Sequence, residues 1–277
     1  MVIILFGIVD MKYSIFTTAN KSYYPFLDIF TGSALANCKN LDKIYVADSG
    51  LGKYQKTIKD KNKVSILDTD CIDEYRGVHS DGWVKATQIK TKYLNKIFHV
   101  IDFDHPVIMI DSDVCILQDI EPIISPHYDI QVTTMSTGGH TRDDGIYISE
   151  IASFVIFNNI PKCKRFIQRW IRQMEKFSEN KTSFPHETPA LNITLKNNFD
   201  NLNIGYLDEI KVCADLEIVD GTYSVHFKSN GSTKDNPVVN FEKRIFSVQN
   251  KTNNDLELDG YLNEQVYADW RNEHETN

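Results

Sequence analysis

The stretch Val107-Ile-Met-Ile-Asp-Ser-Asp-Val-Cys-Ile116 decides the fold of this 277-residue chain. Its first four residues form a continuous apolar run, which predicts a central strand buried on both faces of a sheet. Two carboxylates follow directly, although burying an unpaired charge is expensive. Open α/β sheets bind their ligands at the carboxyl ends of their strands. Asp111 and Asp113 are therefore expected to face a ligand at that edge.

Strand and helix patterns alternate on both sides of this stretch. Further strands are expected at residues 13–18, 43–47, 63–67, 129–134, 152–157, 203–207 and 223–227, and helices at 24–36, 83–100, 161–177 and 191–195. This alternation predicts an α/β fold with a mostly parallel central sheet flanked by helices. The simplest division is one domain over residues 1–250 and a polar C-terminal extension over 251–277, with a possible docking helix at 261–270.

Composition limits the partners and the compartment. The formal net charge is −8 and the pI about 5.5, which argues against a general nucleic-acid binder. Five widely spaced cysteines with no Cys-x-x-Cys pair indicate buried thiols in a reducing, cytoplasmic compartment. The apolar run at residues 1–9 is too short for a transmembrane segment, which needs roughly 20 residues. It is expected to be a strand or a leader upstream of a second possible start at Met11.

The spacing of Asp111 and Asp113 suits a divalent cation. The strand bends as it ends, so both carboxylates can converge on one ion. Hard oxygen ligands favour Mg²⁺ or Mn²⁺. Such an ion, bridging the two phosphates of a nucleotide-sugar, would stabilise a departing nucleoside diphosphate. The other interpretation is that the two aspartates only cap a turn.

The same ten residues resemble the Asp-x-Asp strand of GT-A glycosyltransferases, in particular of glycogenin-like and bacterial lipopolysaccharide galactosyltransferase-like enzymes. The resemblance extends from about Tyr13 to about Asn240, and only the Asp-x-Asp block is specific. It implies a GT-A (Rossmann-like) fold and transfer of a sugar, with retention, from a UDP-sugar to an acceptor hydroxyl on a glycan, protein or lipid. The resemblance also implies a catalytic role for Asp113 and a position beside the nucleotide for Ser112.

The resemblance also implies a nucleoside site where the first strand ends. An asparagine there would hydrogen-bond the base or ribose, and a tyrosine would stack on the base; an ordinary strand-to-helix turn is the alternative. The expected residues are Thr17, Thr18, Ala19, Asn20 and Tyr24, with Tyr23 beside them.

Further positions follow from the resemblance. A basic residue on the helix before the Asp-x-Asp strand is Lys85, with Lys90 as the alternative. Glu187 takes the place of a carboxylate that faces the transferred sugar or the acceptor. His226 corresponds to a third metal ligand beside Asp111 and Asp113. Gly231 and Lys234 would clasp the diphosphate, with Lys228 competing for the role of Lys234.

Several alternatives stay open at this stage. An inverting enzyme would need a carboxylate base, for which Glu187, Asp143, Asp144 and Asp208 qualify. A haloacid-dehalogenase-type phosphatase also uses Asp-x-Asp after an apolar strand, but usually near the start of the chain. A sugar-nucleotide pyrophosphorylase would need an early glycine-rich loop, which is missing after the first strand. A non-catalytic carbohydrate-binding protein would not need a metal.

Overall fold

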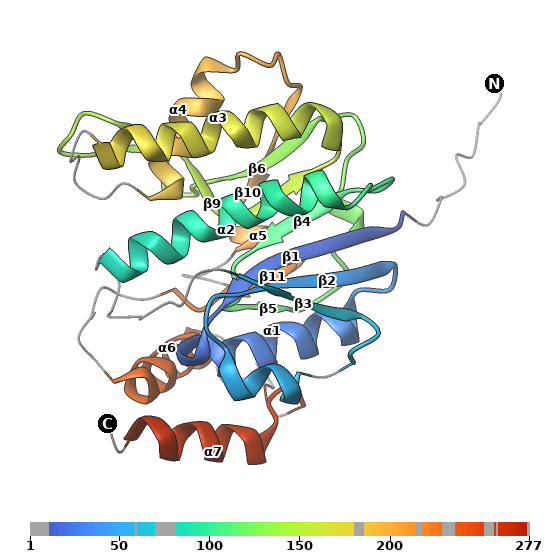
Figure 1. Ribbon diagram of the computed structural model, residues 1–277, viewed down its shortest axis with the longest axis vertical. Helices are drawn as coiled ribbons and strands as arrows, with labels where there is room; N and C mark the ends of the chain where they lie inside the picture. Colours follow the sequence, from blue (N-terminus) through green and yellow to red (C-terminus); the bar gives the residue numbers. More distant parts are fainter. Residues whose placement is uncertain are drawn as a thin grey trace.

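A seven-stranded sheet separates two layers of helices in the computed structural model (Figure 1). The structure describes residues 11–58, 60–69, 81–179, 186–213, 218–228, 236–251, 258 and 260–275. In spatial order the strands are β10 (Ile204–Asp208), β6 (Ile130–Thr134), β9 (Glu150–Phe157), β4 (Val107–Ile110), β1 (Tyr13–Ala19), β2 (Leu41–Asp48) and β3 (Val64–Asp68).

All neighbouring strands are parallel except β9, which runs antiparallel to both β4 and β6. The expected mostly parallel α/β sheet is thus confirmed. Because β9 is reversed, its first residues lie at the edge where β4, β6 and β10 end. Two small antiparallel pairs complete the strands: β5 (Val114–Ile116) with β11 (Ser224–His226), and β7 (His140–Thr141) with β8 (Tyr147–Ile148).

Each face of the sheet has its own apolar core. Helices α2 (Asp81–Val100), α3 (Ile160–Glu179) and α4 (Glu187–Asn197) cover one face. Helices α1 (Tyr24–Asn37), α6 (Pro237–Lys251) and α7 (Glu264–Glu275) lie on the other (Figure 1). Strand β4 serves both cores: Val107 and Met109 face the first, and Ile108 and Ile110 face the second. This explains why its sequence is apolar without alternation.

Short elements fill the remaining connections. They are the 3-10 helices η1 (Lys21–Tyr23), η2 (Gly52–Thr57) and η3 (Glu121–Ile123) and the single helical turn α5 (Glu209–Val212). The predictions did not include β5 or α6, and the strand expected at 223–227 is β11, which pairs outside the main sheet. None of the helices in the described part of the chain is long and apolar enough to cross a membrane.

Helix α7 is anchored on the turn that follows β1. The Trp270 indole is fully buried, and its Nε1 donates a hydrogen bond to the Lys21 carbonyl oxygen over 2.7 Å. The Tyr54 hydroxyl donates to Glu273 over 2.7 Å. These contacts hold the C-terminal helix against η1 and η2, while the division of the chain near residue 250 stays a prediction.

We expect Trp270→Ala to lower the free energy of unfolding by about 3–5 kcal/mol, because it leaves a cavity beneath α7 and removes the indole hydrogen bond. Equilibrium unfolding in urea measures the loss. The control is Arg271→Ala, because the Arg271 side chain on the same helix is 46% exposed. This change should alter the free energy of unfolding by less than about 0.5 kcal/mol. A loss below about 1 kcal/mol for Trp270→Ala would contradict the anchoring role.

Candidate active site

The acidic pair lies where β4 leaves the sheet. The Asp111 amide still donates to the Ser153 carbonyl oxygen of β9, over 2.9 Å. The chain then turns through Ser112 and Asp113 into β5. Because β5 pairs with β11, His226 is opposite Val114, and the Phe227 amide donates to the Asp113 carbonyl oxygen over 2.8 Å. A strand far along the chain is thereby fixed beside the two aspartates.

Three ligand atoms converge at this point. Nε2 of His226 lies 3.2 Å from Oδ1 of Asp113 and 3.9 Å from Oδ2 of Asp111. One such atom from each residue lies within 4.8 Å of the others. An octahedral ion with bonds of about 2.1 Å holds its ligand atoms roughly 3–4 Å apart, so this spacing is close to what a metal needs. Two carboxylate oxygens and an imidazole nitrogen are a donor set that can bind a divalent cation.

A buried lysine holds Asp111. Lys90 of α2 is 3% exposed, and its Nζ pairs with Oδ1 of Asp111 and donates to the Ala152 carbonyl oxygen over 3.2 Å. Burial alone would lower the pKa of Lys90, but the carboxylates of Asp111 and Glu187 outweigh burial and raise it. The lysine is therefore charged, and it neutralises part of the acidic cluster.

An arginine from the opposite layer holds Asp113. Arg244 of α6 pairs through Nη2 with Oδ2 of Asp113, and its Nε donates to the Phe227 carbonyl oxygen. Burial would raise the pKa of Asp113, but the neighbouring His226 and Arg244 outweigh burial and lower it. Asp113 therefore stays ionised. Burial would lower the pKa of His226, but Asp113 instead raises it to about 10, so a bound metal would have to displace a proton from the ring.

Glu187 begins α4 and faces the same buried lysine. Its Oε1 is 3.5 Å from Lys90 Nζ, and its Oε2 is 3.6 Å from Nδ1 of His186. Burial would raise the pKa of Glu187, but Lys90 outweighs burial and His186 adds to the effect, so that the pKa falls to about 2. The carboxylate is thus ionised, buried and next to the acidic pair.

The end of β1 lies at the same edge, because β1 is parallel to β4. Asn20 accepts a hydrogen bond from the Tyr23 amide over 3.1 Å and so caps η1. Thr17 is fully buried, and the Thr18 hydroxyl donates to the Ala47 carbonyl oxygen over 3.0 Å. Ala19 accepts from the Ser49 amide over 3.0 Å. These residues build the turn in which a nucleoside is expected.

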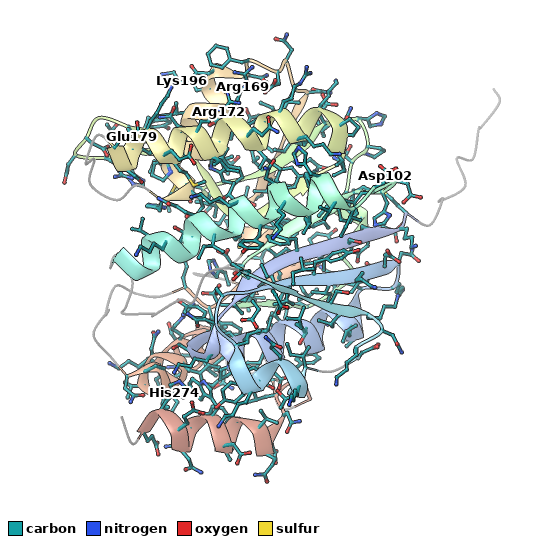
Figure 2. All side chains as sticks on the ribbon, in the orientation of Figure 1. Asp102, Arg169, Arg172, Glu179, Lys196 and His274 are labelled. Carbon is teal, nitrogen blue, oxygen red and sulfur yellow. The ribbon has the colours of Figure 1, made fainter. Side chains whose placement is uncertain are left out.

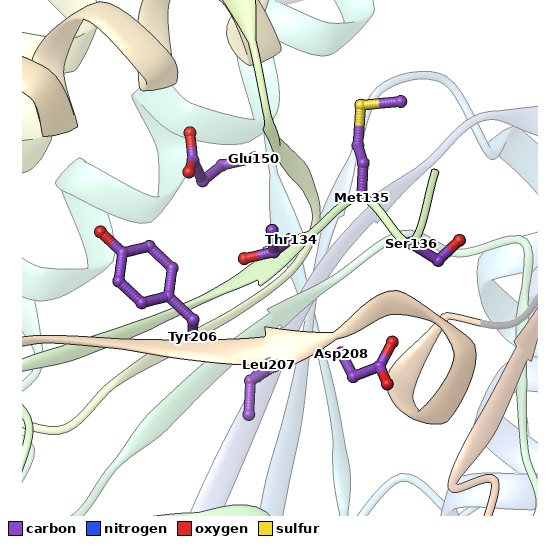
Figure 3. Close-up of a pocket in the computed structure, with 7 residues that line it drawn as sticks. All are labelled: Thr134, Met135, Ser136, Glu150, Tyr206, Leu207 and Asp208. Atoms are coloured by element: carbon purple, nitrogen blue, oxygen red, sulfur yellow. The ribbon is translucent and has the colours of Figure 1, made fainter. Parts of the chain in front are cut away.

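A pocket of about 530 Å³ opens further along this edge (Figure 3). Its lining comes from the ends of β6 and β10 and from the start of β9: Thr134, Met135, Ser136, Glu150, Tyr206, Leu207 and Asp208. Only β9 separates β6 from β4, so at about 4.8 Å per strand the pocket begins roughly 10 Å from the acidic pair. Tyr206 is 63% exposed beside it.

Glu209 connects the rim of this pocket to the segment that follows β11. Its Oε2 accepts from the Ser136 amide over 2.9 Å, and its Oε1 pairs with Lys228 Nζ over 2.7 Å. Lys228 lies two residues after His226. Glu209 therefore links the pocket rim to the segment that follows His226.

Comparison with known proteins identifies the family. The sequence pattern of the family described as nucleotide-diphospho-sugar transferase matches residues 54–258, which is more than half of the chain. The chain belongs to this family. No curated protein matches the chain closely enough to count as a relative.

Two solved structures share the GT-A fold of this transferase. The apo structure of the WbbM bifunctional glycosyltransferase has a TM-score of 0.54 at 14% identity. The match covers 92% of this chain and 52% of the WbbM chain. The structure of the galactosyltransferase LgtC in complex with donor and acceptor sugar analogs has a TM-score of 0.52 at 13% identity. The match covers 84% of this chain and 95% of LgtC. The chain thus spans about half the length of WbbM. The prediction of a GT-A glycosyltransferase is confirmed, and the family favours it over the phosphatase alternative.

Two of the predicted contact residues lie away from the acidic pair. Tyr24 of the transferase is fully buried, where it stacks on Tyr54 at 4.7 Å and accepts a hydrogen bond from Thr57. It cannot stack on a base because its ring is part of the core, whereas the neighbouring Tyr23 is partly exposed. Lys85 is exposed on α2, and the alternative, Lys90, is the lysine that contacts the acidic pair.

The remaining predicted residues are spread over the edge of the sheet. Gly231 and Lys234 lie outside the described residues. Asp143 is exposed near the β7–β8 hairpin, and Asp144 pairs with Arg142 over 2.9 Å. Asp208 lines the pocket and also caps α5 by accepting from the Ile210 amide over 3.1 Å.

Sequence reasoning missed Arg244. The signal that could have found it is the helical spacing of Val238, Phe241, Ile245 and Val248, which places Arg244 on the apolar stripe of α6. A charged residue inside an apolar stripe needs a partner of opposite charge. That partner is Asp113.

We expect Glu187→Gln to lower the free energy of unfolding at pH 7 by about 2–3 kcal/mol, because the charge that Lys90 stabilises is lost. A folded-state pKa of about 2, below the ordinary 4.5, gives stability that is present above pH 4.5 and disappears as the pH falls toward 2. The difference between wild type and variant should therefore shrink across that range. Urea unfolding at a series of pH values measures it.

The matched control is Glu179→Gln at the exposed end of α3 (Figure 2), which should behave as wild type at each pH. If the difference in unfolding free energy between wild type and Glu187→Gln stays constant down to pH 2, the charge of Glu187 does not stabilise the fold.

Proposed function

We propose that this protein transfers a sugar from a UDP-sugar to an acceptor hydroxyl, with retention of configuration, and that Mn²⁺ or Mg²⁺ bound by Asp111, Asp113 and His226 is required. The observation that carries the proposal is the convergence of these three side chains at the carboxyl edge of the sheet, beside the end of β1. The choice of UDP and of retention rests on the sequence resemblance to GT-A enzymes that use Asp-x-Asp.

The chemistry needs a diphosphate held still while negative charge develops on it. When bound, the divalent cation supplies Lewis-acid stabilisation to the leaving diphosphate. Lys90 fixes the orientation of Asp111 and neutralises excess negative charge, so that a donor with a diphosphate can approach. Ser112 lies between the two ligands, and Gly231 and Lys234 are proposed to contact the diphosphate.

Glu187 is the proposed carboxylate on the sugar side of the site. It is ionised, and its side chain is only 9% exposed. A fixed negative charge beside the transferred sugar would stabilise the positive charge that develops at the anomeric carbon. The salt bridge to Lys90 holds this carboxylate in a position linked to Asp111.

The pocket beside β6 and β10 is the proposed acceptor site. Glu150 and Asp208 supply carboxylate oxygens that can accept hydrogen bonds from sugar hydroxyls, and the Tyr206 ring offers a flat apolar face to a sugar ring. Among glycan, protein and lipid acceptors, this combination favours a glycan. The four cysteines that the structure describes are buried free thiols, which supports a cytoplasmic location.

Asp111→Asn and Asp113→Asn should each reduce Mn²⁺-dependent release of UDP from UDP-sugars by at least about a hundredfold, because each removes a charged metal ligand. The assay is hydrolysis of a panel of nucleotide-sugars with and without Mn²⁺. Asp102→Asn, an exposed aspartate in the loop before β4 (Figure 2), is the control and should keep wild-type activity. Near wild-type rates in the Asp113→Asn variant would remove the proposed metal role.

The same assay separates the enzyme from a non-catalytic carbohydrate-binding protein. In that alternative the wild-type protein releases no UDP from any donor, with or without Mn²⁺.

Tyr206→Ala should raise the KM for a sugar acceptor by about tenfold, because a stacking face is lost, while hydrolysis of the donor by water stays unchanged. The measurement compares transfer to a panel of aryl glycosides with donor hydrolysis. Tyr128→Ala, a partly exposed tyrosine outside the pocket lining, is the control. Equal loss of transfer and hydrolysis in Tyr206→Ala would place this ring outside the acceptor site.

A further inference from the structure

Two carboxylates flank one threonine in the lining of the proposed acceptor pocket. Thr134 at the end of β6 is the register partner of Glu150 in β9 and of Asp208 in β10. These three residues form a row across three neighbouring strands, and Figure 3 shows Thr134 between the other two. At about 4.8 Å per strand, the backbones at Glu150 and Asp208 lie roughly 10 Å apart, which leaves room for a sugar ring between the two side chains.

The negative charge of this row is not neutralised within the pocket. None of the seven lining residues is basic, and neither Glu150 nor Asp208 forms an ion pair with another residue in the described part of the chain. Asp208 accepts a hydrogen bond from the Ile210 amide over 3.1 Å, but that donor is neutral. At the rim, the Lys228 ammonium is paired with Glu209 over 2.7 Å. A ligand that enters the pocket therefore meets two carboxylates with no lining cation between them.

An exposed aromatic ring lies beside the same row. Tyr206 precedes Asp208 by two residues on β10, and both are exposed while Leu207 between them is buried, so the two share the exposed side of the strand. The Tyr206 ring is 63% exposed and belongs to the pocket lining. The face of an aromatic ring attracts a cation, and it also packs on the flat side of a sugar ring. The carboxylates and the ring thus favour one kind of ligand, a sugar that carries a positive charge.

We propose that the acceptor is an amino sugar whose protonated amino group is bound by Glu150 and Asp208 and whose ring lies against Tyr206. This assignment rests on the acceptor pocket of the proposed function and names the class of sugar that the pocket selects. An ammonium group offers three hydrogen-bond donors and a full positive charge, which matches two carboxylates that only accept. An N-acetylated sugar lacks the charge, and a sugar that carries a carboxylate is repelled.

The test compares acceptors that differ in one substituent. Aryl glycosides that carry an amino, acetamido, hydroxyl or carboxylate group are offered with the UDP-sugar that the purified full-length enzyme hydrolyses in the presence of Mn²⁺. The value of kcat/KM is measured for each glycoside that accepts a sugar, and the inhibition constant for each one that does not. Wild type should favour the amino glycoside over the hydroxyl glycoside by about tenfold, which corresponds to about 1.4 kcal/mol, and should bind the carboxylate glycoside least.

Glu150→Gln and Asp208→Asn should each reduce the preference for the amino glycoside by about threefold or more, because each removes one charge from the pocket. Both substitutions keep an oxygen that accepts hydrogen bonds, and Asp208→Asn also keeps a cap for α5. Asp102→Asn, the exposed aspartate before β4, is the matched control and should leave the preference unchanged. Circular dichroism checks that each variant is folded.

The outcomes separate this assignment from the proposed function. Equal use of the amino and hydroxyl glycosides by wild type, or a preference that survives in both folded variants, overturns the amino-sugar assignment alone. The comparison within wild type needs no variant, so it decides the matter even where a substitution prevents folding. If wild type releases no UDP from any nucleotide-sugar, the proposed function itself fails.

Discussion

Two buried cations from opposite helical layers hold the acidic pair in place, and the rest of the site depends on this arrangement. Lys90 comes from α2 on one face of the sheet, and Arg244 comes from α6 on the other. Without them, Asp111, Asp113 and Glu187 would place three negative charges in a largely buried space. Buried ion pairs of this kind often add little net stability, because desolvation offsets their attraction. Their value here is geometric: they determine which carboxylate oxygens face inward.

The third residue of the candidate metal site comes from a distant part of the chain. The β5–β11 pair is too short to form a sheet of its own, but it fixes His226 opposite Val114 and delivers the Phe227 carbonyl oxygen to Arg244. Asp113, His226 and Arg244 therefore support one another through backbone as well as side-chain contacts. The turn after β1, which is the expected nucleoside site, joins the same network through Tyr23. Arg244 thus contacts both the candidate metal site and the turn where a nucleoside is expected.

Sequence reasoning recovered what local patterns encode. The apolar run before Asp111 predicted a strand buried on both faces, and β4 contributes to both cores. Strand–helix alternation predicted the sheet and its flanking helices. The same patterns could not decide between Lys85 and Lys90, because both fit the helix and only its packing shows which one is buried. Tyr24 was placed in the site because the end of the first strand resembles the nucleoside site of GT-A enzymes, although it begins a helix most of whose residues are buried. The reversal of β9 and the pairing of Arg244 depend on contacts between distant segments, which no local pattern records.

The reversed strand β9 sets a fixed distance in the proposed reaction. Near its start Glu150 borders the pocket, and a few residues later the Ser153 carbonyl oxygen holds the backbone of Asp111. In the proposed reaction, the separation between the donor's phosphates and the acceptor would therefore be set by the main chain of β9. Side chains at either end could then differ without a change in this main-chain distance. In the proposed reaction, side chains would determine which sugars bind, whereas the main chain of β9 would determine the distance between the two ends of the site.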